Sequence, residues 1–246
     1  MAEESLRQPR ASLLECARAL GFDGVELSGI DDDPIARVTI AAQQAVGVCV
    51  VSVVCHEHDF GAADVTRRGP ARERVVRAVK YADRLGAGIV LLPIHVLTTL
   101  DDFSMIARLE EDLRYIAQRG EALGVVIGCL VPLAAAETLQ FLDTVDSDFV
   151  LCYYDVAQAA HAGRDPAAEI RHLGSRICQV RLREEDGRLL GEGRVDLGGC
   201  LRALAEIQFP GYLILAPPPT PDPMDALRRD LDAVRRALAR VQAVRV

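Results

Sequence analysis

Short apolar runs alternate along the chain with longer segments in which apolar residues recur every three or four positions. Runs such as VCVVSVV and IVLLP are apolar almost throughout, which is typical of parallel strands covered on both faces. The longer segments have the spacing of helices that pack on a sheet. Seven strands are predicted, at 25–27, 48–54, 89–93, 125–130, 149–153, 177–182 and 212–215.

Eight helices are predicted around these strands, at 12–20, 34–46, 70–85, 101–123, 134–145, 166–173, 197–207 and 224–241. Glycine follows five of them, at 21, 47, 86, 124 and 174, where a left-handed C-terminal position favours it. Asp33 and Asp165 precede prolines at helix starts, and Asp101 begins the segment DDFSMIARL. Each aspartate is therefore expected to cap the first turn of its helix.

This alternation predicts an α/β fold with a parallel sheet, and 246 residues suit a single (β/α)8 TIM barrel over 1–246. The first strand should precede residue 12. Only 5–7 has any β character there, so that strand is expected to be short, irregular or absent. The rival architecture is a doubly wound sheet, which usually carries a glycine-rich phosphate turn. The early turns VELSGIDDD and VVCHEHDFG contain no GxGxxG, which weakens that rival.

Composition excludes several classes of protein. The net charge of −8, without a basic block, disfavours nucleic-acid binding, and no apolar stretch is long enough to predict a membrane span. The segment MAEESLRQPR lacks the apolar region of a signal peptide. Seven widely spaced cysteines without a CxxC pair are typical of reduced thiols in a cytoplasmic protein. No cofactor is predicted, the expected partner is a small-molecule substrate, and a homodimer stays open.

Several segments resemble the sugar-phosphate isomerase/epimerase (xylose isomerase-like) family of TIM barrels. They are GFDGVEL, AVKYADRLGAGIVLLP, LGVVIG, YYDVAQA, the run at 177–184, LGEGRVDL and FPGYLILA, and they occur in the family's order over most of 12–240. The resemblance implies a TIM barrel with its chemistry on the loops after the strands. It also implies isomerase, epimerase or lyase activity on small polyhydroxylated or carbonyl compounds.

The resemblance further implies a divalent metal held by Glu, Asp, His and Glu after strands five to eight, with both Glu residues as acid and base. Carried onto this sequence, those positions are Leu130 (or Val131), Asp155, Arg181 and Ala216. One carboxylate cannot hold a hard cation that needs several converging donors, so no metal is expected. Arg181 would place a permanent positive charge there and pair with Asp155. Two interpretations stay open: Arg181 replaces the charge of the metal, or the pair is only structural.

Other polar residues follow the predicted strands. His56 and His58 follow the strand at 48–54, and His95 follows the strand at 89–93. These histidines could converge with Glu26 and Asp155, because strand ends meet at one face of a barrel. Histidine suits acid–base work near neutral pH, so His56 and His95 are candidate catalytic residues together with Glu26, Asp155 and Arg181. The candidates for substrate binding are His58, Gln158, Arg183, Glu184 and Tyr154.

Each candidate also has a plainer interpretation. Loop histidines are often surface residues, and Glu26 can be a structural carboxylate paired with a cation such as Arg181. Tyr153 and Tyr154 should point to opposite faces of their strand, one inward and one toward the helices. Three hypotheses for function follow. The chain is a metal-independent isomerase, epimerase or lyase, a non-catalytic binding pseudoenzyme, or an isomerase with a rearranged metal site. The first is preferred, because ionisable groups remain at the strand ends.

Overall fold

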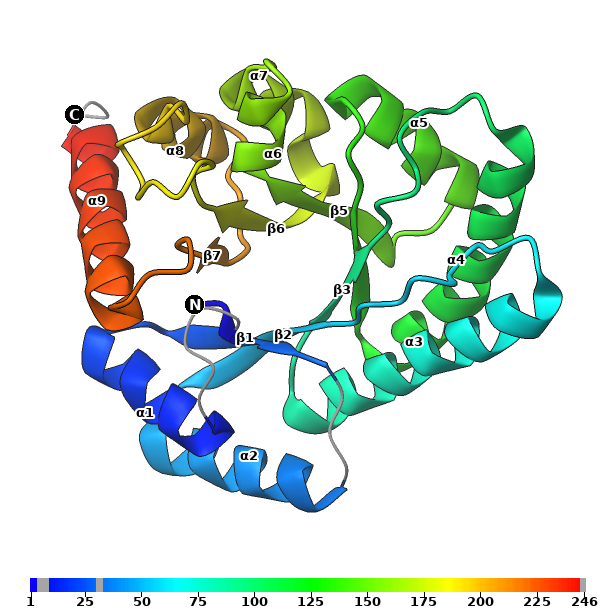
Figure 1. Ribbon diagram of the computed structural model, residues 1–246, viewed down its shortest axis with the longest axis horizontal. Coiled ribbons are helices and arrows are strands. Elements are labelled where there is room, and N and C mark those ends of the chain that lie inside the picture. The colour runs from blue at the N-terminus through cyan, green and yellow to red at the C-terminus, as the bar shows by residue number, and fades with distance from the viewer. Residues whose placement is uncertain (4–8, 30–32, 244–246) are drawn as a thin grey trace.

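A computed structural model describes residues 1–3, 9–29 and 33–243, and its strands form one parallel sheet in chain order. Figure 1 shows the strands in the centre with the helices around them. The strands are β1 (Gly24–Ser28), β2 (Cys49–Val54), β3 (Ile89–Pro93), β4 (Val126–Leu130), β5 (Val150–Asp155), β6 (Ile177–Leu182) and β7 (Leu213–Leu215). The predicted TIM-barrel fold is confirmed.

The helices of the described residues are α1 (Arg10–Leu20), α2 (Asp33–Val46), α3 (Val65–Leu85), α4 (Phe103–Leu123), α5 (Ala135–Val145), α6 (Val156–His161), α7 (Pro166–Leu173), α8 (Leu197–Glu206) and α9 (Pro223–Ala243). All eight predicted helices are present, most of them within two residues of their predicted ends. None of these described helices combines the length and the apolar composition that a membrane crossing requires.

The residues next to the chain start join the first and last strands. Ala2 forms a parallel bridge with Glu26 on β1, and its N–H donates to the carbonyl of Leu215 on β7 at 3.1 Å. The N–H of Glu26 donates to the carbonyl of Met1 at 2.8 Å. These two residues take the place of the short first strand and nearly close the barrel (Figure 1). The predicted location of that strand at 5–7 lies outside the described residues.

Three local predictions need correction. α3 begins five residues before the predicted start at 70, because Asp64 caps it by accepting from the N–H of Thr66, and Pro70 lies inside the helix. α4 is capped by Asp102, whereas Asp101 accepts from the hydroxyl of Thr99 at 2.7 Å. The sequence pattern also missed α6, which follows β5 directly and spans only 6 residues.

Most of the core lies between strands and helices, and a second, small apolar cluster fills the barrel interior. The interior cluster contains Ala2, Val51, Val54, Leu91, Leu130, Tyr153 and Ile214, with Ala216 packed against it. Since strand side chains alternate between faces, half of each strand supplies this interior and half supplies the outer core. The C-terminal ends of the strands therefore form a mouth above a filled barrel.

Candidate functional site

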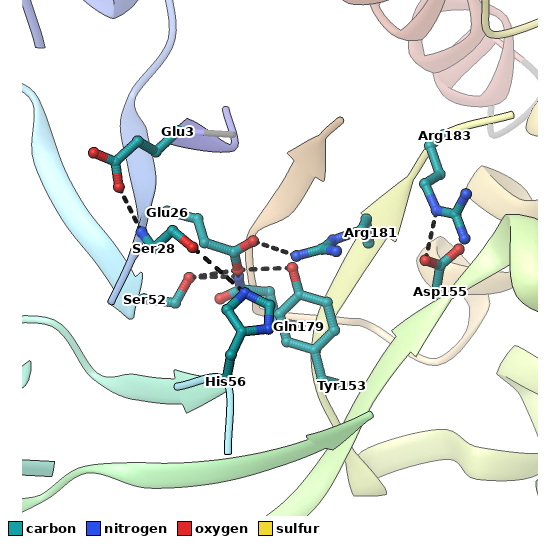
Figure 2. Close-up of polar contacts among 10 residues, drawn as sticks. All are labelled: Glu3, Glu26, Ser28, Ser52, His56, Tyr153, Asp155, Gln179, Arg181 and Arg183. Carbon is teal, nitrogen blue, oxygen red and sulfur yellow. Dashed lines mark hydrogen bonds and ion pairs between the residues drawn. The ribbon is translucent and has the colours of Figure 1, made fainter. Parts of the chain in front are cut away.

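A buried carboxylate lies at the centre of the barrel interior. Glu26 on β1 is 1% exposed, and three neutral groups donate to its Oε2. They are the hydroxyl of Ser52 at 2.9 Å, the hydroxyl of Tyr153 at 2.8 Å and Nε2 of Gln179 at 3.1 Å (Figure 2). Nε2 of Gln179 also donates to Oγ of Ser52 at 2.8 Å. We call these four residues, with Arg181, the inner polar cluster.

Arg181 on β6 completes this cluster. Its Nη2 donates to Oε1 of Glu26 at 2.6 Å, and its guanidinium carbon lies 5.4 Å from the centre of the Tyr153 ring. Burial alone would lower the pKa of Arg181, but the groups of Tyr153 and Glu26 outweigh it and raise that pKa. Arg181 therefore keeps its positive charge inside the barrel, next to Glu26.

Tyr153 is a donor in this cluster, not an acid. Burial raises the pKa of Tyr153 well above its ordinary value, and the charge of Glu26 raises it further. The next residue, Tyr154, points to the helices, where its hydroxyl donates to Oε2 of Glu169 on α7 at 2.8 Å. The predicted opposite directions of the two tyrosines are confirmed. Tyr154 faces away from the mouth, so its position conflicts with the predicted role in substrate binding.

Asp155 ends β5 and forms a second ion pair, which lies apart from the inner polar cluster in Figure 2. Its Oδ2 accepts from Nε of Arg183 at 2.7 Å, while its Oδ1 accepts from the N–H groups of Ala157 and Gln158 at the start of α6. Asp155 and Arg181 are register partners on neighbouring strands. The predicted ion pair between them is nevertheless wrong: Arg181 pairs with Glu26, as the plainer interpretation of Glu26 held.

The three histidines do not converge with Glu26 and Asp155. Nε2 of His56 lies 3.4 Å from Oγ of Ser28, at the end of β1 (Figure 2). His58 and His95 are exposed and share a small crevice of about 40 Å³. His56 is also exposed.

Two further candidates have structural contacts. Glu184 is 5% exposed, and its carboxylate accepts from the N–H groups of Arg194 and Val195 within the loop after β6. Gln158 is half-buried on α6, where its N–H contacts Asp155. Arg183 is 28% exposed and, like Glu184 but unlike Gln158, lines a hollow at the mouth.

That hollow has a volume of about 400 Å³ and lies between the loops after β6 and β7. Arg181 and Arg183 contribute to its wall together with residues 184–187 and 216–219. A larger hollow of about 880 Å³ lies outside the barrel, between the 189–198 segment, α8 and α9. Of these two hollows, only the first borders a residue of the inner polar cluster, Arg181, so it is the better candidate for a site.

Comparison with known proteins identifies the family of this chain. A family model described as xylose isomerase-like TIM barrel matches residues 14–237. The chain belongs to this family. Among curated protein sequences, none matches the chain.

Solved structures agree on the fold of this xylose isomerase-like barrel. An L-ribulose 3-epimerase superposes with a TM-score of 0.86 at 19% identity, covering 95% of this chain and 90% of that chain. A 3-keto-D-glucoside 4-epimerase from E. coli gives 0.83 at 17% identity, with 93% and 95% covered. A D-psicose 3-epimerase from Clostridium cellulolyticum H10 gives 0.82 at 19% identity, with 94% of each chain covered. Identities this low show the fold alone.

The residues at the metal positions implied by the xylose isomerase-like family do not fit a divalent cation. Leu130 belongs to the interior apolar cluster, and Ala216 packs against it. Arg181 is a cation, and both oxygens of Asp155 already accept from Arg183 or from α6. Among the described residues, no three His, Cys, Asp or Glu side chains gather as a metal site. A divalent cation would meet one committed carboxylate beside a guanidinium, which cannot replace its hydration shell.

Sequence reasoning missed Ser52 and Gln179, although a signal for both was present. Each is a polar residue inside a largely apolar strand run, Ser52 in VCVVSVV and Gln179 in ICQVRL. A polar side chain buried in a strand needs a partner, so both residues pointed to an internal polar group. Ser28 was also missed. Its backbone N–H donates to Oε2 of Glu3 at 2.6 Å, and its carbonyl accepts from Nη2 of Arg10 at 2.9 Å.

The loop after β6 is attached to α9 through Asp230, which is 1% exposed. Its Oδ1 accepts from the N–H of Leu190 at 2.8 Å, while its Oδ2 is buried without a hydrogen-bond partner among the described residues. Burial raises the pKa of Asp230 to about 6, and the charge of Glu192 adds to this effect. The folded chain therefore keeps this proton to a higher pH than the unfolded chain does.

We expect the free energy of unfolding to depend on pH through Asp230. Because the folded pKa is raised, ionisation favours the unfolded chain, and stability is lost as pH rises from about 4 to about 6. Relative to Asp230→Asn, the wild type should lose about 1–3 kcal/mol between pH 4 and pH 7. Urea unfolding of both proteins at the two pH values measures this difference. An equal pH dependence of the two proteins would show that Asp230 is not the group responsible.

Proposed function

We propose that this protein is a metal-independent isomerase, epimerase or lyase that acts on a small polyhydroxylated or carbonyl compound at the mouth of the barrel. The observation that carries the proposal is the position of Arg181. Its guanidinium is held by buried Glu26 at 2.6 Å and borders the hollow of about 400 Å³. That volume suits a small-molecule ligand.

The proposed chemistry is proton transfer at a carbon next to a carbonyl. His56 accepts the proton from that carbon, the C–H electron pair forms the enolate, and the guanidinium of Arg181 stabilises the negative charge on its oxygen. Return of the proton from His56 to the neighbouring carbon, with the hydroxyl proton of that carbon passing to the enolate oxygen, completes an isomerisation. An epimerisation instead requires that a second proton donor, such as water, protonates the same carbon on the opposite face, while His56 keeps the abstracted proton. His56 suits this role because it is exposed at the mouth, next to Ser28.

Glu26 and Asp155 take positioning roles in this proposal. Glu26 accepts from four donors and is 1% exposed, so a substrate proton cannot reach it without disrupting the cluster. Asp155 is 4% exposed and holds Arg183 and the start of α6. Each carboxylate fixes one guanidinium at the wall of the hollow. His58 remains a proposed contact for the substrate, and His95 remains a candidate catalytic residue.

A second candidate function is binding without catalysis. It is favoured by Leu130 and Ala216, which are aliphatic where the resemblance implied the acid and base of the epimerases. A pseudoenzyme of this kind would keep the hollow and its arginines. It would bind its ligand without exchanging any carbon-bound proton with solvent.

Proton exchange distinguishes the two functions. The protein is incubated in D₂O with EDTA and a panel of ketoses and keto-sugar acids, including D-fructose, D-psicose, L-ribulose and 5-keto-D-gluconate. Proton NMR then follows the C–H signals next to each carbonyl. The enzyme proposal predicts deuterium incorporation or conversion of at least one compound, unchanged by EDTA. Binding of a panel compound with no exchange would favour the pseudoenzyme, and loss of activity in EDTA would contradict metal independence.

A further inference from the structure

Two arginines from one strand face the same hollow. Arg181 and Arg183 are two residues apart on β6 and its C-terminal extension, so their side chains leave the same face of the strand. Each has one edge fixed by a buried carboxylate, Glu26 for Arg181 and Asp155 for Arg183. A guanidinium carries five N–H donors, and these contacts use only part of them. The arginines are therefore fixed in place at the wall of the hollow, with donors that these contacts leave unused.

The carboxylates around the hollow differ in how firmly they are held. Asp155 and Glu184 are 4% and 5% exposed, and both accept from backbone N–H groups. Glu185 is different. Its side chain is 33% exposed, and its Oε1 lies 2.8 Å from Nη1 of Arg183. A partly exposed ion pair of this kind contributes little to stability, so an incoming anion can replace it.

From this arrangement we infer that the small molecule bound at the mouth carries a carboxylate group, which replaces Glu185 at Arg183 and extends toward Arg181. The inference deepens the proposed function and rests on the same hollow. Planar guanidinium groups match a carboxylate with paired N–H donors. Without such a ligand, Glu185 provides the carboxylate that Arg183 contacts.

A carboxylate fits this hollow better than a phosphate does. Glu184, Glu185 and Asp186 all line the hollow, and the whole chain has a net charge of −8. Repulsion from these carboxylates grows with the charge of the ligand, so a phosphate group near −2 is disfavoured more than a carboxylate at −1. A sugar acid with one carboxylate therefore matches the two arginines and is repelled less by these side chains than a sugar phosphate is.

The test compares three ligands of similar size that differ in charge. Calorimetric titration with D-gluconate, sorbitol and D-glucose 6-phosphate is made on the full chain at low salt. We expect D-gluconate to bind with a Kd in the millimolar range or tighter, and at least tenfold more tightly than the other two. Equal or tighter binding of sorbitol, tighter binding of the phosphate, or no binding of D-gluconate would overturn the inference.

Three variants then localise the binding. Arg183→Gln should weaken D-gluconate binding at least tenfold, and Glu185→Gln should tighten it about threefold, because a competing carboxylate is removed. Arg188→Gln is the matched control, since Arg188 is an exposed cation of the same loop that does not line the hollow. Equal losses in Arg183→Gln and Arg188→Gln would contradict the inference. Since Glu185 is partly exposed, its variant is expected to fold even if the Arg183 variant does not.

The two proposals can fail independently. Carboxylate binding that depends on Arg183, without any exchange of carbon-bound protons, would contradict the proposed enzyme activity and support this inference. Conversion of neutral ketoses at the same rate by the wild type and by Arg183→Gln would support the proposed enzyme activity. It would overturn the inference that the ligand carries a carboxylate.

Discussion

Replacing Glu26 by glutamine is expected to lower the free energy of unfolding by about 3 kcal/mol. Glutamine has the shape of glutamate, so the change removes the charge that pairs with Arg181 while the packing is kept. Nη2 of Arg181 and the donors from Ser52, Tyr153 and Gln179 would then compete for one neutral amide. The expected loss lies at the lower end for a broken buried ion pair, because Arg181 is 13% exposed. Urea unfolding followed by circular dichroism measures it.

Two further variants test whether this loss comes from the ion pair between Glu26 and Arg181. Glu185→Gln breaks an exposed ion pair to an arginine of the same region, and its loss should stay below about 1 kcal/mol. The double variant Glu26→Gln with Arg181→Met leaves no unpaired charge and should recover a large part of the loss. A loss below about 1 kcal/mol for Glu26→Gln alone would show that the ion pair does not hold the barrel interior together.

Replacing His56 by alanine is expected to slow exchange of the substrate proton by about 10²–10⁴-fold, the usual contribution of a positioned acid–base group. His56 does not line the hollow, so substrate affinity should change little and the loss should fall on the rate of the chemical step. The measurement is the initial rate of deuterium incorporation, over a range of concentrations of the panel compound that reacts.

His172→Ala is the control for this experiment, because His172 is exposed on α7, away from the strand ends. Its rate should equal that of the wild type. If His56→Ala exchanged the proton at the wild-type rate, His56 would not be the base. The role would then fall to His58 or His95, which share the neighbouring crevice. Single alanine variants at those two positions would then identify the base.

The fold was predictable because the strands are short, apolar and regularly spaced. β3 and β6 match their predicted bounds, and the predicted inward and outward directions of Tyr153 and Tyr154 follow from alternation alone. The first strand was predictable only as short, irregular or absent, and its residues were not. It is replaced by Met1 and Ala2, whose contacts are backbone hydrogen bonds that no side-chain pattern encodes.

Glu26, Asp155, Arg181 and Arg183 were predictable as members of the candidate site, but the contacts among them were not. Alternation indicates that Glu26 and Arg181 both point inward, but the distance across the barrel between residues 155 positions apart is not written in the sequence. Asp155 was expected to meet Arg181, its neighbour in register, and contacts Arg183 instead. The reason is α6, a helix of 6 residues that is too short to show a helical period. The N–H groups at the start of α6 donate to Oδ1 of Asp155, and Oδ2 is left to accept from Arg183.

An arginine held by Glu26 stands where the resemblance implied a divalent metal. A crystal grown or soaked in MnCl₂, with anomalous diffraction data, tests it most directly. We expect Nη2 of Arg181 within hydrogen-bond distance of Glu26 and no manganese peak beside Asp155. A manganese ion coordinated by Asp155, with Arg181 turned away from Glu26, would contradict the account.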